Sequence, residues 1–345
     1  MNIYLPNGYI DIDKILQPKG FNKFFFVGPR GSGKSFGVLD YEYKRCLNGA
    51  GKFFYVRTNQ VELDLLRDPE LSPFVALNIK NHYDITLKKK NQYLVSIYED
   101  SENMENPIGS CLALSTVFHV RGMSANLYQD IFYDEFIPEQ HVRKMKGQGK
   151  AVKQMYETFN RNRELEGEPA MRLICCANSD DLNNDLLMSY DLVDHLLQMR
   201  AEDIEVKDFP DRGLRLIYPL HSPIAEKKKN TAAYKGESGS YVNMALGNEF
   251  VSFYKGNIQP RDIKQFDPVV KIGSLCIYKS KTNKEIYITR YQRGEFKEIY
   301  DLTDYNLSRF RLRHHKLQQH YYNKKIKFES SSCELEFVNL WDKQK

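Results

Sequence analysis

The sequence predicts an α/β domain built on a mainly parallel sheet, followed by a smaller α+β domain. Its first 200 residues alternate short apolar runs with helical patterns, as a parallel sheet with crossover helices requires. Beyond residue 240, strand patterns instead follow one another before a basic segment, which is typical of an α+β order. A chain of 345 residues is also longer than a domain with a single hydrophobic core usually is, so two domains are expected.

The expected strands of the first domain are four apolar runs, at residues 24–27, 53–56, 131–133 and 172–177. Between the second and third runs, residues 83–87 and 93–98 flank a lysine-rich turn and predict a β-hairpin. We expect this hairpin to add antiparallel strands at one edge of the sheet.

The second domain is expected to contain strands at 272–278 and 285–290, a basic segment at 309–327 and a short helix near 333–341. Residues 221–240 combine a lysine triplet with Gly, Pro, Ser and Asn, a composition that indicates a linker or an exposed loop. The predicted division is a first domain over 1–200, a linker region over 201–240 and a second domain over 241–345.

The composition is typical of a soluble globular protein, with 41% hydrophobic and 28% charged residues. No stretch approaches the roughly 18 apolar residues of a membrane span, and the N-terminus lacks the features of a signal peptide. The sequence thus predicts a cytoplasmic protein without a membrane partner. The six cysteines have no C-x-x-C spacing, which favours buried free thiols over a zinc site or disulfides.

The net charge of +5 is unevenly distributed, with −2 over residues 1–200 and +7 over residues 201–345. The basic second part predicts contact with a polyanion or with an acidic protein surface. A basic, solvated face would have the same composition.

A glycine-rich segment with the pattern G-x-x-x-x-G-K-S joins the first apolar run to a helical stretch: Gly28, Pro29, Arg30, Gly31, Ser32, Gly33, Lys34 and Ser35. Strand, loop and helix in this order are typical of a phosphate-binding loop, in which backbone N–H groups surround phosphate oxygens. Lys34 is expected to reach the β- and γ-phosphates, and the Ser35 hydroxyl to bind Mg²⁺. With Phe36, these residues form the predicted ATP site. An ordinary glycine-rich turn is the alternative.

Residues 130–135 form an apolar strand that ends in two carboxylates, the form of a Walker B element. Asp134 is expected to join Ser35 in holding Mg²⁺, and Glu135 to orient and deprotonate the attacking water. A surface pair of acids is the alternative, but a parallel sheet brings both strand ends to one edge. An internal base favours nucleotide hydrolysis, and the layout resembles the additional-strand, catalytic-glutamate (ASCE) branch of P-loop ATPases.

Two further features lie around this predicted site. The run 172–177 ends at Asn178, which is expected either to sense the γ-phosphate and polarise the water or to cap the next helix. Arg161 and Arg163 lie near the end of a predicted helix, where they either complement the helix dipole or reach a neighbouring subunit's site in a ring. Sequence spacing does not choose between these roles.

The segment 143–150 has the composition of a loop that contacts a phosphate backbone. It is basic and contains glycine, and its predicted DNA-binding residues are Arg143, Lys144, Lys146 and Lys150. Such a loop can follow DNA without reading bases, so that its affinity falls steeply with salt. A solvated loop is the alternative.

Together these segments resemble the DNA-packaging ATPases of small phi29-type tailed bacteriophages. The matching segments are GPRGSGKS at 28–35, FYVR at 54–57, IFYDEF at 131–136, RNRE at 161–164 and CCANS at 175–179. The resemblance is clear over residues 20–180 and looser over 240–345. It implies a terminase-like, homopentameric ring motor, docked on the portal of an empty prohead in the host cytoplasm, that drives double-stranded DNA inward with ATP and Mg²⁺. Whether a scaffold RNA or a protein mediates docking stays open.

The resemblance also assigns roles to single residues. It makes Lys34 and Ser35 phosphate-loop residues, Asp134 and Glu135 the Walker B pair, and Arg161 a trans-acting arginine finger. Arg121 takes the place of a second basic residue that reaches across the subunit interface. A member of the family has lysine there, and arginine and lysine differ in geometry.

The family's C-terminal domain resembles a degenerate RNase H-like nuclease fold that has lost its metal carboxylates and serves in docking. Here the first predicted hairpin of that domain offers one acidic residue, Glu285. Two-metal cleavage needs several converging carboxylates, so nuclease activity is not expected. The other acidic candidates fall in loop-like contexts: Asp262, Asp267, Asp301 and Asp304.

Three other functions fit parts of the sequence. A cellular-type ring DNA translocase or helicase would share the ATPase domain. A large terminase would add an active C-terminal nuclease. A nucleotide-gated docking protein would bind without hydrolysis, and Glu135 argues against it.

Overall fold

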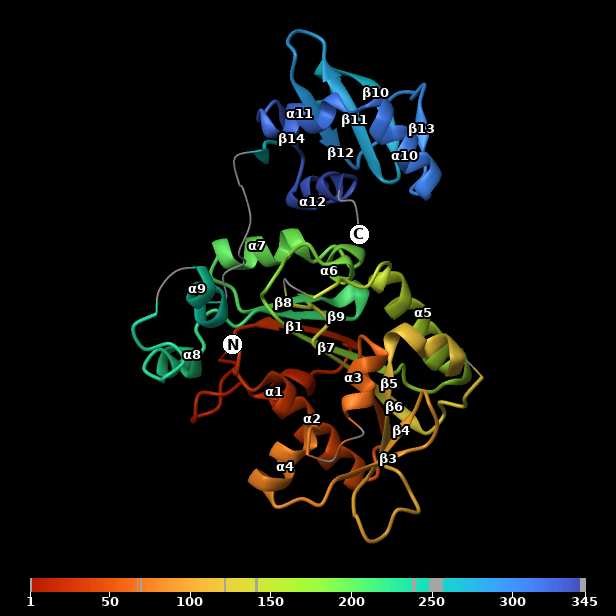
Figure 1. Cartoon of the computed structure of the whole chain (residues 1–345), viewed down its shortest axis with the longest axis vertical. Helices are drawn as coiled ribbons and strands as arrows, with labels where there is room; N and C mark the ends of the chain where they lie inside the picture. Colours follow the sequence, from red (N-terminus) through yellow and green to blue (C-terminus); the bar gives the residue numbers. More distant parts are fainter. Residues whose placement is uncertain are drawn as a thin grey trace. The chain divides into compact units, whose positions relative to one another are not determined.

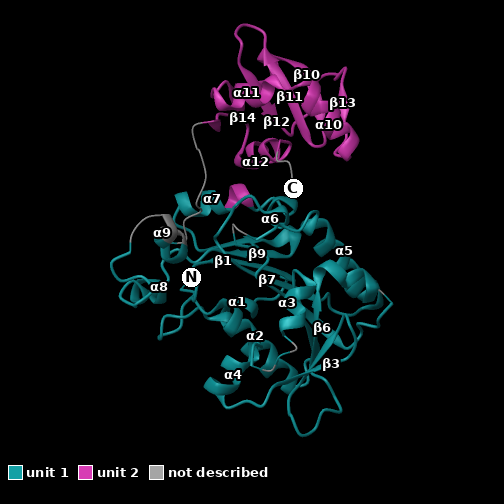
Figure 2. Cartoon of the chain, viewed as in Figure 1, with its two compact units in different colours: residues 1–192, 196–251 teal, residues 193–195, 252–345 magenta. Residues whose placement is uncertain are grey.

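The computed structural model describes residues 2–66, 68, 70–120, 122–139, 142–237, 240–247 and 257–341. The chain forms two compact units, residues 1–192 with 196–251 and residues 193–195 with 252–345 (Figure 2). As the sequence predicts, the larger unit is an α/β domain and the smaller an α+β domain. No helix among the described residues is both long enough and apolar enough to cross a membrane.

The larger unit is built on a nine-stranded sheet in the order β3-β4-β5-β2-β6-β7-β1-β9-β8 (Figure 1). The strands are β1 (Lys23–Gly28), β2 (Lys52–Arg57), β3 (Thr86–Lys89), β4 (Val95–Tyr98), β5 (Gly109–Ala113), β6 (Tyr128–Asp134), β7 (Arg172–Asn178), β8 (Val206–Phe209) and β9 (Leu214–Ile217). The strands from β5 to β9 in this order are parallel. The hairpin β3–β4 and strand β8 add antiparallel strands at the two edges.

Helices cover both faces of this sheet, which explains why its strands read as continuous apolar runs (Figure 1). One face carries α1 (Ile12–Leu16), α2 (Lys34–Leu47), α3 (Gln60–Leu65) and α4 (Phe74–Asn81), and Val38 of α2 joins Phe24 of β1 in the core there. The other face carries α5 (Gln148–Asn160), α6 (Asp185–Ser189) and α7 (Val193–Ala201). The Phe159 ring of α5 stacks on Phe54 of β2 with centroids 4.4 Å apart.

The four predicted strands lie within β1, β2, β6 and β7, and the predicted hairpin is β3–β4, with Leu87 opposite Ile97. The sequence did not predict β5, which is short and begins with two small residues, Gly109 and Ser110. The described residues also form four 3₁₀ helices: Leu114–Val120, Arg163–Glu166, Pro210–Arg212 and Ile263–Gln265.

The segment predicted to be a linker, 201–240, differs from that expectation. It contains β8, β9 and α8 (Pro223–Lys228), and α9 (Ser240–Gly247) follows it. β9 pairs with β1 and places Leu214 opposite Lys23. The pattern is hard to see in the sequence because both strands have only four residues and the buried Arg215 interrupts β9, where it pairs with Asp208 at 2.7 Å. The larger compact unit therefore continues to residue 251.

The smaller unit has a five-stranded sheet in the order β13-β10-β11-β12-β14. Its elements are β10 (Phe266–Ile272), β11 (Leu275–Ser280), β12 (Ile286–Thr289), β13 (Ile299–Tyr300), α10 (Asp304–Arg313), α11 (Lys316–Tyr322), β14 (Ile326–Phe328) and α12 (Ser331–Asn339). A turn at Gly273, where φ is +54°, divides the predicted strand 272–278 into the end of β10 and most of β11. The predicted short helix near 333–341 corresponds to α12. A likeness to an RNase H-like fold stays a prediction.

Candidate nucleotide site

The sheet order brings four strand ends to one edge of the larger unit. β7 lies between β1 and β6, with Asn178 opposite Gly28 and Cys176 opposite Asp134, and β2 lies beyond β6. Because these strands are parallel, the phosphate loop after β1 and the polar residues that end the other three strands share this edge. The predicted residues from three distant parts of the sequence therefore meet.

The loop between β1 and α2 has the backbone of a phosphate-binding loop. Gly31 and Gly33 have φ of +69° and +90°, values that side chains disfavour. A Cβ on Gly33 would lie 2.9 Å from the Tyr9 ring, so the N-terminal segment packs closely against the loop. The Ser32 hydroxyl donates to the Pro29 carbonyl at 3.0 Å and holds the turn. These contacts explain why glycine stands at these positions.

Lys34 is buried inside this loop, with a relative exposure of 5%. Its ammonium donates to the Gly28 and Pro29 carbonyls at 3.1 and 2.8 Å and to Asn178 Oδ1 at 3.3 Å. Burial lowers the pKa of this ammonium to about 8. An anion beside it would favour the charged form, so the group is suited to holding phosphate.

Ser35 and Asp134 form a pair of oxygen ligands of the kind that Mg²⁺ prefers. The Ser35 hydroxyl donates to Asp134 Oδ1 at 2.7 Å, and the Tyr55 hydroxyl donates to Asp134 Oδ2 at 3.2 Å. Asp134 is buried, and burial raises the pKa of its carboxyl while Arg57 and Ser35 oppose that change. A divalent cation would compensate the buried charge, so the donor set fits Mg²⁺.

Glu135 follows Asp134 in an unusual backbone conformation, with φ at +54°. This turn directs its main-chain N–H to Asp134 Oδ1 at 3.1 Å. Its carboxylate is 55% exposed and forms an ion pair with the guanidinium of Arg57 at the end of β2. Left-handed backbone at a non-glycine residue is costly and tends to occur at functional sites. The turn sets Glu135 beside Asp134 and Ser35, the predicted metal ligands.

Arg57 is a residue of the site to which the sequence alone assigns no role. Besides Glu135, it contacts Glu62 at 3.1 Å, the Tyr55 hydroxyl at 3.4 Å and Asp134 at 3.8 Å. It therefore links the predicted base to the predicted metal ligand. A basic residue at the end of an apolar strand was the available signal, but the sequence does not show that β2 lies next to β6.

Asn178 lies where β7 ends beside the phosphate loop, within hydrogen-bond distance of Lys34. The alternative role as a helix cap belongs instead to Asn184, whose side chain accepts from two N–H groups at the start of α6. Next along the chain, the buried Asp180 accepts from Arg30 at 3.2 Å, and Arg30 also pairs with Glu139 at 2.8 Å. The loop is thus tied to the end of β7 by side chains from both.

Residues of the predicted linker also contact the phosphate loop. Lys228, the last residue of α8, donates to the Arg30 carbonyl at 3.2 Å, and the Arg30 N–H donates to the Ala245 carbonyl of α9 at 3.0 Å. A Cβ on Gly31 would lie 1.8 Å from the Lys228 ammonium. No sequence motif pointed to Lys228, because nearly 200 residues separate it from the loop.

Phe36, the first residue after Ser35, lies beside an aromatic and cationic cluster at the start of α2. The Lys80 ammonium lies 4.7 Å from the centre of the Phe36 ring and 5.1 Å from that of Tyr9. Phe36 and Tyr9 are half-buried. The rings therefore offer flat apolar surface next to the phosphate loop.

Arg161 and Arg163 lie away from this subunit's own phosphate loop. The exposed Arg161 donates to the Met123 carbonyl at 3.4 Å, and the buried Arg163 donates to the Tyr128 carbonyl at 2.7 Å. Tyr128 begins β6 and Asp134 ends it, so about 20 Å of strand separates them. Arg163 is thus held in the fold, whereas Arg161 is at the surface. Arg121 lies outside the described residues.

The four basic residues predicted to contact DNA are all exposed: Arg143, Lys144, Lys146 and Lys150. Lys144 is tied to Asp181 at 2.6 Å and to the Asn183 carbonyl at 2.7 Å. Lys150 lies in the first turn of α5. The structure thus places a basic surface between the end of β6 and α5.

The phosphate loop between β1 and α2, with its serine bonded to the aspartate that ends β6, defines a P-loop NTPase. The chain belongs to the Podovirus DNA encapsidation protein (Gp16) family, whose profile matches residues 3–343.

Relatives and solved structures agree with this membership. The DNA packaging protein of Bacillus phage phi29 is 24% identical over 313 residues, which cover 88% of this chain and 84% of that protein. The fold is similar to that in the bacteriophage phi29 viral genome packaging motor assembly, with a TM-score of 0.66, 18% identity and coverage of 98% and 99%. The Phi-28 gp11 DNA packaging motor gives a TM-score of 0.62 and 14% identity, with 96% of each chain covered.

Proposed function

We propose that this protein hydrolyses ATP and uses the energy to drive double-stranded DNA into a preformed prohead. The observation that carries the proposal is the contact between Ser35 and Asp134, with Glu135 adjacent and Lys34 inside the loop. Membership in a DNA encapsidation family and similarity to a phage DNA packaging protein support the choice of DNA as cargo.

Each side chain has a role that its position supports. Lys34 and the loop N–H groups hold the phosphates, and Ser35 with Asp134 would hold Mg²⁺, which neutralises charge that builds up on the phosphates. Glu135 orients the attacking water and takes its proton. Asn178 lies beside Lys34, where it can hydrogen-bond to the γ-phosphate.

The acting form is a homo-oligomeric ring, a pentamer, in which Arg161 enters the neighbouring subunit's site. Its exposure and its distance from its own phosphate loop support this role. Arg121 is proposed as a second residue that crosses the interface. The basic surface at Arg143, Lys144, Lys146 and Lys150 contacts the DNA backbone.

The C-terminal domain is proposed to dock the motor on the portal of the prohead, in the host cytoplasm, without nuclease activity. Its acidic residues have local partners that support this view. Glu285 pairs with Arg261 at 2.9 Å, Asp262 caps a 3₁₀ turn, and Asp301 accepts from Thr303 and Asn306. Among the described residues, no group of three or more acidic, histidine or cysteine side chains is arranged to hold a metal.

The test is ATP turnover with and without duplex DNA. Glu135→Gln should lower turnover at least about 100-fold, because a general base contributes that much or more. Glu157→Gln, an exposed carboxylate on α5, is the matched control and should keep turnover. Unchanged turnover in Glu135→Gln would exclude hydrolysis by this base. Strand separation of a forked DNA would favour a helicase, and Mn²⁺-dependent cleavage lost on changing Asp301 would favour a large terminase.

A further inference from the structure

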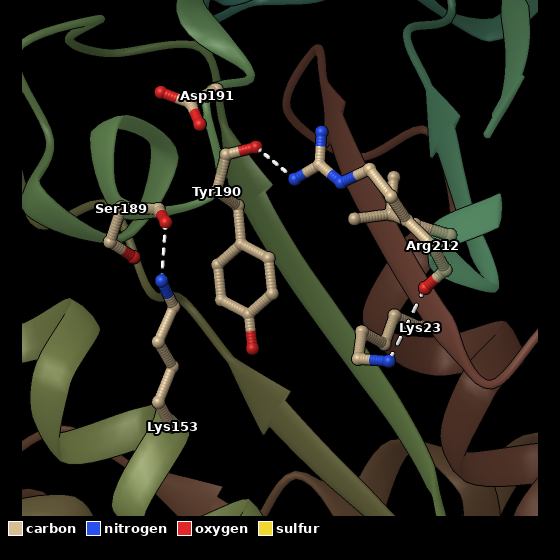
Figure 3. Close-up of a pocket in the computed structure, with 7 residues that line it drawn as sticks. Lys23, Lys153, Ser189, Tyr190, Asp191 and Arg212 are labelled. Carbon is tan, nitrogen blue, oxygen red and sulfur yellow. Dashed lines mark hydrogen bonds between the residues drawn. The ribbon is translucent and has the colours of Figure 1, made fainter.

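An open cavity of about 500 Å³ lies at the edge of the large sheet opposite the phosphate loop (Figure 3). Its lining includes Lys23 at the start of β1, Lys153 of α5, Tyr190 and Asp191 after α6, and Arg212 before β9. The phosphate loop begins at the other end of β1, so about 15–20 Å of strand separates the two sites. The cavity is therefore distinct from the nucleotide site.

Three cations line this cavity: Lys23, Lys153 and Arg212. Lys23 donates to Asn22 Oδ1 at 2.9 Å and to the Arg212 carbonyl at 3.4 Å. Lys153 donates to the Ser189 carbonyl, and Arg212 to the Tyr190 carbonyl. In the part of the chain that the structure describes, none of the three forms an ion pair. Neutral acceptors, three of them backbone carbonyls, thus orient these cations.

Aromatic rings position the same three cations. The Lys153 ammonium lies 4.8 Å from the Tyr190 ring, Lys23 lies 5.4 Å from the Tyr156 ring, and the Arg212 guanidinium lies 5.4 Å from the Phe209 ring. Figure 3 shows the Tyr190 side chain between Lys153 and Lys23, with Asp191 on the far side of Tyr190 from Lys23. The Tyr190 hydroxyl thus lies between the two lysines, and Asp191 lies toward the other end of the tyrosine.

The surroundings of Lys23 disfavour its charged form. Burial lowers the pKa of Lys23, the charge of Glu164 raises it, and the smaller effect of Arg212 lowers it again. Like charges held close together repel each other, and an anion between them would relieve that repulsion. The cavity is therefore suited to an anionic ligand with several acceptor oxygens.

We infer that this cavity binds phosphate groups of a nucleic-acid backbone through Lys23, Lys153, Arg212 and the Tyr190 hydroxyl. A phosphodiester carries one charge per group and accepts hydrogen bonds from such donors without regard to base. Lys153 lies three residues after Lys150 on α5, so the two share a side of the helix and connect the cavity to the predicted DNA-binding surface. A packaging motor meets nucleic acid, so this site rests on the proposed function, but its binding is measurable without ATP.

The test is binding of the full chain to a short fluorescent duplex DNA and to a single-stranded RNA of the same length, by anisotropy without nucleotide. The triple variant Lys23→Gln, Lys153→Gln, Arg212→Gln should raise Kd about 10-fold or more at ~0.1 M salt. The slope of log K against log salt should become shallower by about 2 to 3, because each lost phosphate contact removes roughly 0.9 for duplex DNA.

Two matched variants keep the outcome interpretable. Lys88→Gln, Lys89→Gln, Lys90→Gln removes the same charge from exposed residues of the β3–β4 hairpin and should bind as the wild type does. Lys23→Arg, Lys153→Arg, Arg212→Lys keeps the charge and should retain most of the affinity. If the neutralised variant loses affinity for DNA alone, duplex DNA is the source of the phosphate. If it loses affinity for RNA alone, RNA is the source. Equal affinities in the neutralised variant, the hairpin variant and the wild type would overturn the site. A wild-type protein that binds neither probe would overturn the proposed function as well.

Discussion

The guanidinium of Arg57 forms an ion pair with the carboxylate of Glu135, across the gap between the ends of β2 and β6. Arg57 also contacts Asp134 at 3.8 Å, and Glu62 at 3.1 Å fixes its orientation. The predicted catalytic base is thus held by a side chain of the neighbouring strand. Release of this pair would free the carboxylate to meet the attacking water.

Arg57→Ala should raise ATP turnover in the absence of DNA by about 5-fold, because a half-exposed ion pair contributes on the order of 1 kcal/mol. Stimulation by DNA should fall in proportion. Steady-state phosphate release with and without duplex DNA measures both. Glu62→Gln removes another of the three carboxylates that contact Arg57 and should change turnover less. A drop as deep as that of Glu135→Gln would mean that Arg57 supports the chemical step instead of restraining its base.

ATP binding should become weaker as the pH rises above about 8. Burial lowers the pKa of Lys34 to about 8 from an ordinary value near 10.5, so the free site loses its charge above that pH. Phosphate favours the charged form, and binding at pH 9 should therefore take up close to one proton. Calorimetry in buffers of different ionisation enthalpy counts the protons. Lys34→Met should show no such uptake, and the same uptake in that variant would assign it to another group.

The low pKa of Lys34 also predicts a stability change. Between about pH 8 and 10.5 the unfolded chain holds a proton that the folded site has lost, so the contribution of Lys34 to the free energy of unfolding rises with pH there. Below pH 8 the cost of burying the charge is fully present. Urea unfolding of the wild type and of Lys34→Met across this range measures the difference between their free energies of unfolding. This difference should become smaller toward high pH.

Mixed rings test whether Arg161 acts in trans. Arg161→Ala subunits keep an intact phosphate loop, and Lys34→Ala subunits keep an intact Arg161. Each variant alone should be almost inactive, since an arginine finger is worth roughly 10³- to 10⁵-fold in related phosphoryl transfer. Mixtures should regain part of the turnover at shared interfaces. Verified mixed rings that stay inactive would place the arginine's role within its own subunit.

Lys228→Ala should weaken ATP binding several-fold while leaving the fold intact. Its ammonium lies over the phosphate loop, bonded to the Arg30 carbonyl at 3.2 Å, where it can attract phosphate. Lys229→Ala is the matched control, because this adjacent lysine pairs with Glu226 at the surface. Titration with a fluorescent ATP analogue compares the two. Equal effects would show that the charge of the segment matters rather than the contact of Lys228.

Removing one partner of a buried charge network should destabilise the larger unit strongly. Arg172 makes a bidentate contact with the fully buried Asp130, at 2.6 and 2.7 Å, and Glu42 lies beside them. Arg172→Met would leave two buried carboxylates sharing Arg45, and we expect a loss of about 3–5 kcal/mol in urea unfolding. Lys44→Met breaks an exposed pair with Asp40 and should cost less than about 1 kcal/mol. Similar losses of unfolding free energy in both variants would contradict the idea that burial makes the Arg172 contact the more costly one to break.

Much of the site was predictable because local chemistry dictates it. The glycines at 31 and 33, the lysine and serine after them and the acidic pair after an apolar run each have a sequence signal that needs no neighbour. The long strands could also be recognised in the sequence, because both faces of the sheet are covered and its strands are therefore continuous apolar runs. The short strands β5, β8 and β9 were not, because four or five residues with charged or small side chains give no clear period.

The phosphate loop that opens a helix and the two carboxylates that end a strand are recognisable from sequence, because these patterns depend on residues a few positions apart. Which distant residues meet that loop depends on how the whole chain folds. The pairing of β7 with β1 set Asn178 beside Lys34, the pairing of β2 with β6 set Arg57 on Glu135, and α8 brought Lys228 to Arg30. Such contacts depend on strand order and helix packing, which no short stretch of sequence encodes.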